Sequence, residues 1–298
     1  MSKKVLITGS TGMLGFEILD FLKKQNKFDI TLINRKRNFS RENEIVLDLI
    51  DNNALIKALE KIEPDVIVHC AALTDVNLCE SETSYAYKLH VESTMNLAKY
   101  CPSAKFIYIS TDSVYDGVIG NYVETDLTNP VNYYATTKLE GEDKVLKYSK
   151  NPLIIRTNLF GFHQKPLNSL FEWGIRSFNS NQLVYGFENV FFNPIYTKNL
   201  AKLVNYFINN ETETGVFNFG SKNITNKYNF LDFIRILSNK PSNLIESKIL
   251  RNDLEVRRPL NTYLNIEKIE KRISSFIDLD LFSNIIDCHK SYLKNENH

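Results

Sequence analysis

The sequence predicts an α/β fold in which helices cover both faces of a parallel sheet. Two observations support this prediction. In the first half of the chain, short apolar runs rich in β-branched residues alternate with longer stretches that are apolar at helical spacing. The short runs are apolar at successive positions, as in residues 65–69, which is typical of strands buried on both faces. Strands of this kind separated by helices form a doubly wound parallel sheet.

The predicted elements of the first half follow one another as strand and helix. Strands are expected at residues 5–7, 30–34, 45–47, 65–69, 106–109 and 153–155. Helices are expected up to about residue 24, over 54–61, over 82–100 and, opened by Pro130, through Tyr134. Ligands bind outside the carboxyl ends of the strands in such sheets, so the residues that follow these strands should share one crevice.

The second half of the chain is less regular. Helices are expected at 168–178 and 198–209, and strands at 183–185, 190–192 and 216–219, with helices and loops from Tyr228 onward. We expect residues 161–298 to form a smaller mixed α/β lobe that binds the substrate. Late strands and helices of the first domain are expected within the same stretch, so the two parts are interleaved in sequence.

Composition excludes several classes of protein. Of the 298 residues, 43% are hydrophobic and 24% charged, and the net charge of +1 gives no field that would recruit nucleic acid or an anionic membrane. The cysteines Cys70, Cys79, Cys101 and Cys288 lie far apart, which argues against a zinc site and a disulfide framework. No signal peptide and no membrane helix are recognised in the sequence. We therefore expect a cytoplasmic protein with reduced thiols.

A glycine-rich turn follows the first predicted strand and precedes the first helix. The spacing Gly9-x-x-Gly12-x-x-Gly15 in this setting is typical of a Rossmann-type dinucleotide site, with the pyrophosphate at the helix N-terminus. An ordinary strand–helix turn is the alternative. We expect residues 1–160 to form an NAD(P)-binding Rossmann domain. The turn residues expected at the cofactor are Gly9, Ser10, Thr11, Gly12, Met13, Leu14 and Gly15.

The end of the second predicted strand favours NADPH over NADH. An NAD site usually places an acid there, on the ribose 2′-hydroxyl, but this strand ends in Asn34 and continues with Arg35, Lys36 and Arg37. The basic run suits a 2′-phosphate; NADH stays the alternative cofactor, and a solvated charged loop the alternative interpretation. Asp48, which closes the third strand, is expected at the adenine amino group.

The candidate catalytic residues are Thr111, Tyr134 and Lys138. A tyrosine four residues before a lysine lies on the same helix face, and the lysine charge should lower the tyrosine pKa toward neutrality. A phenol of that kind exchanges a proton with a carbonyl oxygen, which the Thr111 hydroxyl can also hold. A plain pair on a helix surface is the alternative. Together with the dinucleotide site, these residues predict hydride transfer to or from a carbonyl.

Several motifs resemble the extended short-chain dehydrogenase/reductases and, within them, the dTDP-4-dehydrorhamnose reductases. The glycine turn, residues 69–80, residues 110–117 and residues 134–142 carry the resemblance, with weaker similarity near residues 155–157, 193–197 and 258–259. The resemblance covers nearly the whole chain and is strong to about residue 160.

The resemblance implies roles for individual residues. Tyr134 would protonate the oxygen of a 4-keto sugar, Lys138 would lower the Tyr134 pKa and hold the nicotinamide ribose, and Thr111 would bind the keto oxygen. Further cofactor contacts are expected from Leu49, Ala71, Ala72 and Leu73, in addition to Tyr134 and Lys138. Expected substrate contacts are Thr74, Thr111, Asp112, Ser113, Asn158, Phe162 and Arg258.

The sequence departs from related enzymes at three places. Ser113 replaces the glutamate with which sugar-nucleotide dehydratases remove water, so dehydration is disfavoured. His90 replaces an asparagine that orders a relay water; histidine can bond similarly or titrate, and a satisfied core histidine is the alternative. Glu17 matches one metal-binding glutamate of some relatives, but Asn199 stands where another would be, so no metal is expected.

The leading hypothesis is an NADPH-dependent reductase of a nucleotide-activated 4-keto-6-deoxyhexose in deoxysugar and surface polysaccharide biosynthesis. The alternatives are a nucleotide-sugar epimerase, a reductase of another sugar nucleotide, or a non-catalytic NADP-binding module such as the regulatory subunit of methionine adenosyltransferase, which resembles this family. The expected partner is a nucleotide sugar, with no nucleic acid and no membrane, and the resemblance implies a homodimer.

Overall fold

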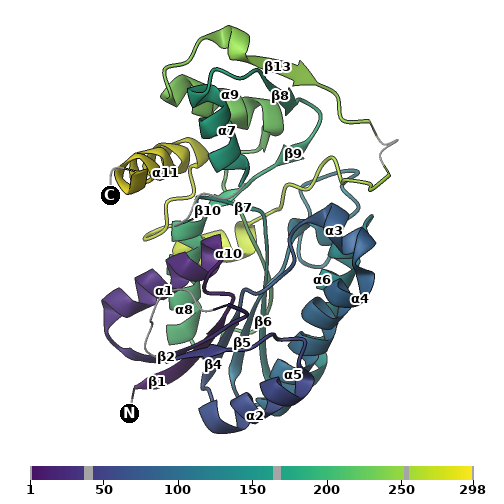
Figure 1. Cartoon of the computed structure of the whole chain (residues 1–298), viewed down its shortest axis with the longest axis vertical. Coiled ribbons are helices and arrows are strands. Elements are labelled where there is room, and N and C mark those ends of the chain that lie inside the picture. The colour runs from purple at the N-terminus through teal and green to yellow at the C-terminus, as the bar shows by residue number, and fades with distance from the viewer. Residues whose placement is uncertain (1, 37–42, 164–168, 252–254, 297–298) are drawn as a thin grey trace.

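A computed structural model describes residues 2–36, 43–163, 169–251 and 255–296 of the chain. Its centre is a seven-stranded sheet in the order β11-β6-β5-β4-β1-β2-β3, in which every neighbouring pair is parallel (Figure 1). These strands are β1 (Lys3–Thr8), β2 (Phe28–Asn34), β3 (Glu44–Val46), β4 (Val66–His69), β5 (Lys105–Ile109), β6 (Asn151–Thr157) and β11 (Gly215–Phe219). The predicted doubly wound parallel sheet is confirmed.

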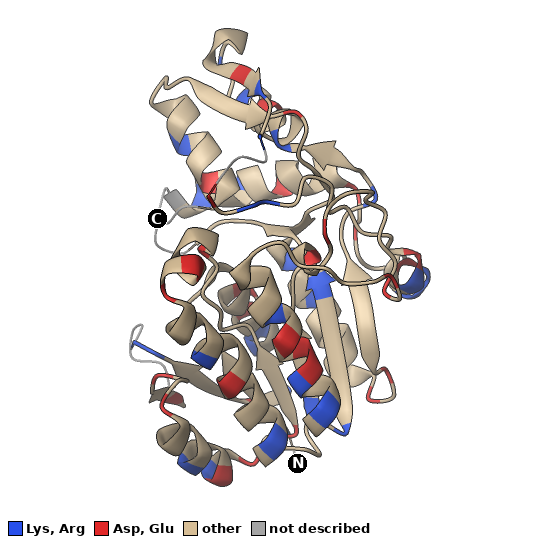
Figure 2. Cartoon of the chain, turned by 90° about the vertical axis from the view of Figure 1, so that its right-hand side faces the viewer, with Lys and Arg blue, Asp and Glu red and all other residues tan. Residues whose placement is uncertain are grey.

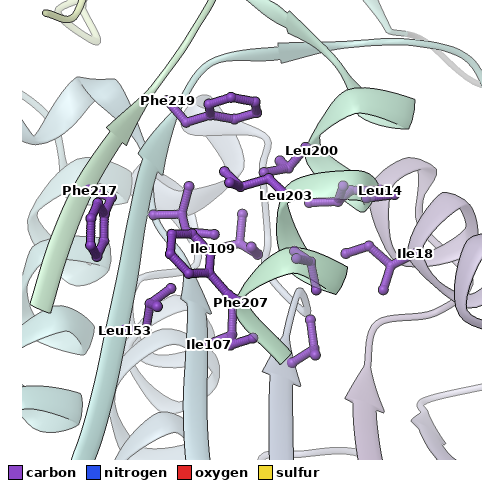
Figure 3. Close-up of a cluster of buried hydrophobic side chains, with 14 of the residues drawn as sticks. Leu14, Ile18, Ile107, Ile109, Leu153, Leu200, Leu203, Phe207, Phe217 and Phe219 are labelled. Atoms are coloured by element: carbon purple, nitrogen blue, oxygen red, sulfur yellow. The ribbon is translucent and has the colours of Figure 1, made fainter. Parts of the chain in front are cut away.

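Helices cover both faces of this sheet, because side chains at alternate positions of each strand point to opposite faces. One face packs against α1 (Met13–Gln25), α8 (Thr197–Asn209) and α10 (Glu267–Ile273), and the other against α2 (Asn52–Ile62), α5 (Ser93–Tyr100) and α6 (Tyr133–Tyr148). Thus Val5 and Ile7 of β1 join the first core and Leu6 the second. Figure 3 shows the first core, where Leu203 and Phe207 of α8 lie with Ile107 and Ile109 of β5.

The helix predicted over residues 82–100 differs from the prediction in two ways. Helical structure starts earlier, with α3 (Val76–Ser81) capped by Asp75, and continues as α4 (Thr83–Tyr87) after a break at Glu82. A π-helical turn over Lys88–Glu92 then joins α4 to α5. The sequence pattern missed α3 because its few apolar residues show no sustained helical period. The π turn carries His90 and lies against α6.

The second half builds a smaller lobe at the carboxyl ends of the strands (Figure 1). Its helices are α7 (Leu170–Asn179), α9 (Lys227–Leu237) and α11 (Leu281–Glu296), around a core of their own. Its short strand pairs are β7 (Leu159–Phe160) with β10 (Ile195–Tyr196), β9 (Phe191–Phe192) with β12 (Thr225–Asn226), and β8 (Val184–Phe187) with β13 (Ile245–Lys248). Because α8, β11 and α10 return to the main sheet, the chain crosses between the two parts more than once.

Charges of both signs are interspersed over the helices that face the viewer in Figure 2, in keeping with the small net charge. Within the described ranges, no helix is both long and apolar enough to span a lipid bilayer.

Candidate active site

One cavity of about 660 Å³ lies at the carboxyl ends of β1, β4, β5 and β6. It brings together the glycine turn and the predicted catalytic residues, as parallel strands would require. The predicted residues that line it are Gly9, Gly12, Met13, Leu14, Gly15, Ala72, Thr74, Thr111, Asp112, Ser113, Tyr134, Lys138 and Asn158.

A second hollow of about 230 Å³ adjoins this cavity and shares part of its lining, including Gly9 and Ala72. The other predicted cofactor residues in its wall are Thr11, Asn34, Arg35, Asp48, Leu49, Ala71 and Leu73. Most of the residues assigned to the cofactor from the sequence therefore line two adjoining hollows, of which the smaller holds the residues expected at the adenosine.

The geometry of the glycine turn fits a dinucleotide. Gly9 has φ +71°, and a Cβ there would lie 2.7 Å from the backbone nitrogen of Ala71. A Cβ on Gly15 would lie 2.3 Å from the Gly9 carbonyl oxygen, so both positions require glycine. The N-terminus of α1 has no side-chain cap at Gly12, which leaves its positive end for a pyrophosphate.

The end of β2 differs from the sequence-based picture. The buried Asn34 amide is already bonded, since its Nδ2 donates to Ser10 Oγ at 2.9 Å and to Glu44 Oε1 at 2.7 Å. The expectation that no carboxylate reaches this strand end was therefore wrong, because β3 brings Glu44 beside it. Arg35 instead donates from Nη1 to the Tyr85 hydroxyl at 2.7 Å. Arg37 lies outside the described residues.

Tyr134 and Lys138 share a face of α6 but are not electrostatically linked as expected. The helix starts at Tyr133, after Asn132 rather than at Pro130, and Asn132 Oδ1 accepts from the Ala135 backbone N–H at 3.0 Å. Lys138 Nζ donates to the Ile109 carbonyl at 2.7 Å and sits 4.0 Å from the centre of the Tyr108 ring. It is thus directed to the end of β5.

The pKa values correct the expected role of Lys138. Burial raises the pKa of Tyr134 above its usual value, although a hydrogen bond with Thr111 works in the opposite direction. Burial also lowers the pKa of Lys138 to about 7. The prediction that Lys138 lowers the Tyr134 pKa toward neutrality was therefore wrong for this structure. The phenol is protonated at neutral pH, which is the state a proton donor needs.

The triplet Thr111–Ser113 is held from both parts of the molecule. Asp112 is buried, and its Oδ2 accepts from Asn158 Nδ2 at 2.9 Å and from Thr262 Oγ1 at 2.5 Å. Its Oδ1 accepts from the hydroxyls of Thr111 and Ser113, each at 3.2 Å. Asp112 therefore fixes its neighbours, and the hydroxyl of Thr111 stays at the cavity. Thr262 was not predicted.

His90 is a satisfied, neutral core residue. Its Nε2 accepts from the Leu73 backbone N–H at 2.9 Å, so Nδ1 carries the proton and donates to Thr137 Oγ1 at 2.8 Å. Burial and the Lys138 ammonium lower the pKa of His90 to about 3. Of the roles considered from the sequence, the contacts favour the satisfied core histidine. The ring instead joins the cofactor wall to α6 and lies edge-on to Tyr134, with 5.8 Å between ring centres.

A buried ion pair behind the cavity was also missed. Arg156 on β6 bonds Glu142 on α6, with 2.7 Å between Nη2 and Oε2, and both side chains are almost wholly buried. Ser110 donates to Glu142 Oε1 at 2.5 Å. These contacts clamp α6 to the ends of β5 and β6, next to Lys138.

Two predicted substrate residues lie outside the cavity lining. Arg258 lines a separate hollow with Asp75 and Glu80, and its Nη2 donates to Asn77 Oδ1 at 2.9 Å. Phe162 packs edge-on against Tyr292, with 5.5 Å between ring centres.

His163, next to Phe162 in the chain, does line the cavity, and its Nδ1 lies 2.7 Å from Glu172 Oε2. Although burial works against it, hydrogen bonds from His163 and Ser169 lower the pKa of Glu172 to about 2. A local sequence signal was available here, because Ser169 and Glu172 form a capping box at the start of α7.

The residues considered for a metal do not form a cluster. Asn199 donates to the Asp278 carbonyl at 2.7 Å and to Asn284 Oδ1, while Glu17 lies in a shallow hollow with Asp20. In the part of the chain that the structure describes, no group of three or more His, Cys, Asp and Glu side chains is arranged to hold a metal ion.

Comparisons with known proteins identify the family. A model of the RmlD substrate binding domain matches residues 3–278. The chain is 30% identical over 281 residues to methionine adenosyltransferase 2 subunit beta of Danio rerio, covering 90% of this chain and 84% of that protein. It is 25% identical over 286 residues to dTDP-4-dehydrorhamnose reductase of Aggregatibacter actinomycetemcomitans, covering 90% of this chain and 92% of that protein.

A similar fold is found in the crystal structure of dTDP-4-dehydrorhamnose reductase from Bacillus anthracis in complex with NADP. The TM-score is 0.86 at 24% sequence identity, and the match covers 98% of this chain and 100% of that chain.

Proposed function

The chain belongs to the RmlD substrate binding domain family, and from this membership and the site geometry we propose that it is an NADPH-dependent reductase of a nucleotide-activated 4-keto-6-deoxyhexose. The observation that carries the proposal is the convergence of Thr111, Tyr134 and Lys138 with the glycine turn on one cavity. A binding module has no need of this catalytic set.

Three side chains have roles in this reaction, together with a bound nicotinamide. A nicotinamide held in the cavity beside Lys138 would supply the hydride for the carbonyl carbon. Tyr134 donates its phenolic proton to the keto oxygen, and burial keeps that proton in place at neutral pH because it raises the phenol pKa. Thr111, whose hydroxyl donates to Asp112 Oδ1 in this structure, would turn that single O–H to the same oxygen when the sugar binds. Lys138, held by the Ile109 carbonyl, stands beside the site where it can hold the nicotinamide ribose.

Ser113 supports reduction over dehydration. A dehydratase of this superfamily needs a carboxylate base next to its aspartate, but here the position holds a hydroxyl that is bonded to Asp112 at 3.2 Å. Without an activating base, this hydroxyl cannot remove a carbon-bound proton.

The test is NADPH oxidation, followed by absorbance, with a panel of nucleotide-linked 4-keto-6-deoxyhexoses, starting with the dTDP sugar. Rapid oxidation with one sugar and the loss of that activity in Tyr134→Phe are the expected results. Turnover that survives Tyr134→Phe would contradict the mechanism. NADPH binding without oxidation of any sugar would contradict the reductase and leave an epimerase or a binding role.

A second candidate is favoured by one specific observation, the 30% identity to a methionine adenosyltransferase beta subunit over most of the chain. In that case the protein would bind NADP and regulate a partner enzyme. Size-exclusion chromatography of the chain mixed with a methionine adenosyltransferase catalytic subunit tests this directly. A stable complex together with no sugar reduction supports the regulatory role, whereas reduction without a complex removes it.

The setting of the reductase is part of the same proposal. We infer that it works in the cytoplasm as a homodimer that feeds deoxysugar synthesis for surface polysaccharides. The four cysteines are free thiols, which suits a reducing compartment. Light scattering at the elution peak of the purified chain tests the dimer.

A further inference from the structure

The smaller hollow is bridged by two residues from different elements. Arg35 follows the end of β2, and Tyr85 lies on α4, fifty residues further along the chain. Arg35 Nη1 donates to the Tyr85 hydroxyl at 2.7 Å, and both side chains line the hollow together with Asp48 and Leu49. The guanidinium, although exposed, is therefore held beside the hollow that the adenosine is expected to occupy.

The guanidinium keeps donors for an anion. Within the described ranges, its bond to Tyr85 is the one hydrogen bond that it makes, and it has no carboxylate partner. The Tyr85 hydroxyl is neutral and accepts from one of the five guanidinium N–H groups. The remaining N–H groups are free to bind a phosphate in a bidentate manner. The neighbouring Asn34 amide offers no alternative, because Ser10 and Glu44 already use it.

Tyr85 is itself held in place. Its side chain is half-buried and packs against the second core, which includes Leu89 and Leu97. Arg35, in contrast, is exposed. A long exposed side chain loses much rotamer freedom when it grips a ligand, and a fixed hydroxyl removes part of that loss before the ligand arrives.

We propose that Tyr85 is a positioning residue for cofactor selection, which holds Arg35 over the adenosine hollow so that its guanidinium receives a 2′-phosphate and the chain prefers NADPH to NADH. This inference rests on the nicotinamide cofactor of the proposed function but not on the sugar substrate. A reductase and a regulatory subunit would both need it to bind NADPH selectively.

The test measures dissociation constants for NADPH and NADH, by the fluorescence of the bound reduced nucleotide, without any sugar. Tyr85→Phe removes only the hydroxyl, and Tyr87→Phe, on the same helix but outside the hollow lining, is the matched control. For a hydrogen bond to a charged group we expect Tyr85→Phe to weaken NADPH about 3- to 10-fold and NADH less than about 2-fold. Tyr87→Phe should change neither constant.

A double substitution shows whether the hydroxyl acts through Arg35. Arg35→Gln should weaken NADPH by more than Tyr85→Phe does, and Tyr85→Phe added to Arg35→Gln should have no further effect on NADPH. Competition by 2′,5′-ADP should follow the NADPH constants, whereas competition by 5′-AMP should not change. Circular dichroism checks that each variant is folded.

Three results would overturn the proposal. Equal weakening of NADPH and NADH by Tyr85→Phe would mean that the ring only shapes the adenine hollow. An unchanged NADPH constant in Tyr85→Phe, alongside a weakened one in Arg35→Gln, would mean that Arg35 acts alone. Additive effects in the double variant would separate the two residues. Failure of sugar reduction leaves these binding results intact, so the two proposals fail independently.

Discussion

The cofactor half and the substrate lobe hold their functional side chains in different ways. In the cofactor half, Lys138 is bonded to the end of β5 and His90 ties the cofactor wall to α6. In the lobe, the predicted substrate residues Phe162 and Arg258 are held by neighbours away from the cavity. The residues proposed for catalysis and for the cofactor thus lie at the sheet ends, and the lobe completes the same cavity with Leu159, His163, Ser169 and Leu170.

The difference between the cofactor half and the lobe is tested most severely by removing one tyrosine hydroxyl from each. Tyr134→Phe should lower kcat by about 10³-fold or more, since it removes the proton donor for the carbonyl oxygen. The measurement is NADPH oxidation at saturating sugar, with the NADPH dissociation constant unchanged. The control is Tyr185→Phe, an exposed lobe tyrosine, which should leave kcat within about 2-fold. Comparable losses in both variants would abolish the distinction between the two halves.

The free energy of unfolding should also differ between the two regions, depending on whether a buried or an exposed ion pair is broken. Arg156→Met leaves the Glu142 carboxylate buried without its partner and should cost about 3–5 kcal/mol of unfolding free energy in urea titrations. Lys198→Met breaks the exposed pair with Asp287 between α8 and α11 and should cost less than about 1 kcal/mol. A small loss in Arg156→Met would mean that the clamp behind the cavity is not needed to hold α6.

The sequence predicted what local patterns encode. The glycine turn, Thr111 and the Tyr134–Lys138 pair follow from strand ends and helical spacing, and the structure gathers them at one cavity. Spacing did not determine where a side chain points, which is why Lys138 reaches the Ile109 carbonyl and does not lower the Tyr134 pKa.

The missed residues share a different property, since each depends on a partner far away in the chain. Thr262 lies 150 residues from Asp112, and Tyr85 lies 50 residues from Arg35. No local period or spacing encodes such contacts, because they exist only once the sheet and the lobe have packed together. The same limit applied to Glu44, which the parallel pairing of β3 with β2 brings beside Asn34.

The lowered pKa of Lys138 gives stability a pH dependence that belongs to the cofactor half. Folding takes the pKa of Lys138 from an ordinary 10.5 to about 7, because burial disfavours the ammonium. Below about pH 7 the lysine is charged in both states, so the folded state carries the whole cost of burying the charge. As the pH rises from 7 to about 10.5, the folded lysine loses its proton and this cost disappears.

Lys138→Met never carries that cost. Its Tm minus that of the wild type should therefore be most favourable at or below about pH 7 and should decrease steadily toward about pH 10. Calorimetry at several pH values measures the difference. Lys147→Met, which replaces an exposed lysine in the last turn of the same helix, is the control measured alongside it. A difference for Lys138→Met that is constant over this range would contradict the assigned pKa shift.

The smallest expected effect concerns the hydrogen bond that Thr262 of the lobe donates to Asp112 of the Thr111–Ser113 triplet. Thr262→Val keeps the shape of the side chain but removes the hydroxyl that donates to Asp112 Oδ2, and it should cost about 1–3 kcal/mol of stability, as for a bond to a charged group. The lobe should then close less firmly over the sugar, so KM for the sugar should rise several-fold while the NADPH dissociation constant stays the same. Thr225→Val is the matched control, because among the described residues that buried lobe hydroxyl donates just to the carbonyl of Asn226. A change in NADPH affinity in Thr262→Val would show that the lobe also shapes the cofactor half, and the two regions would then have to be treated as one site.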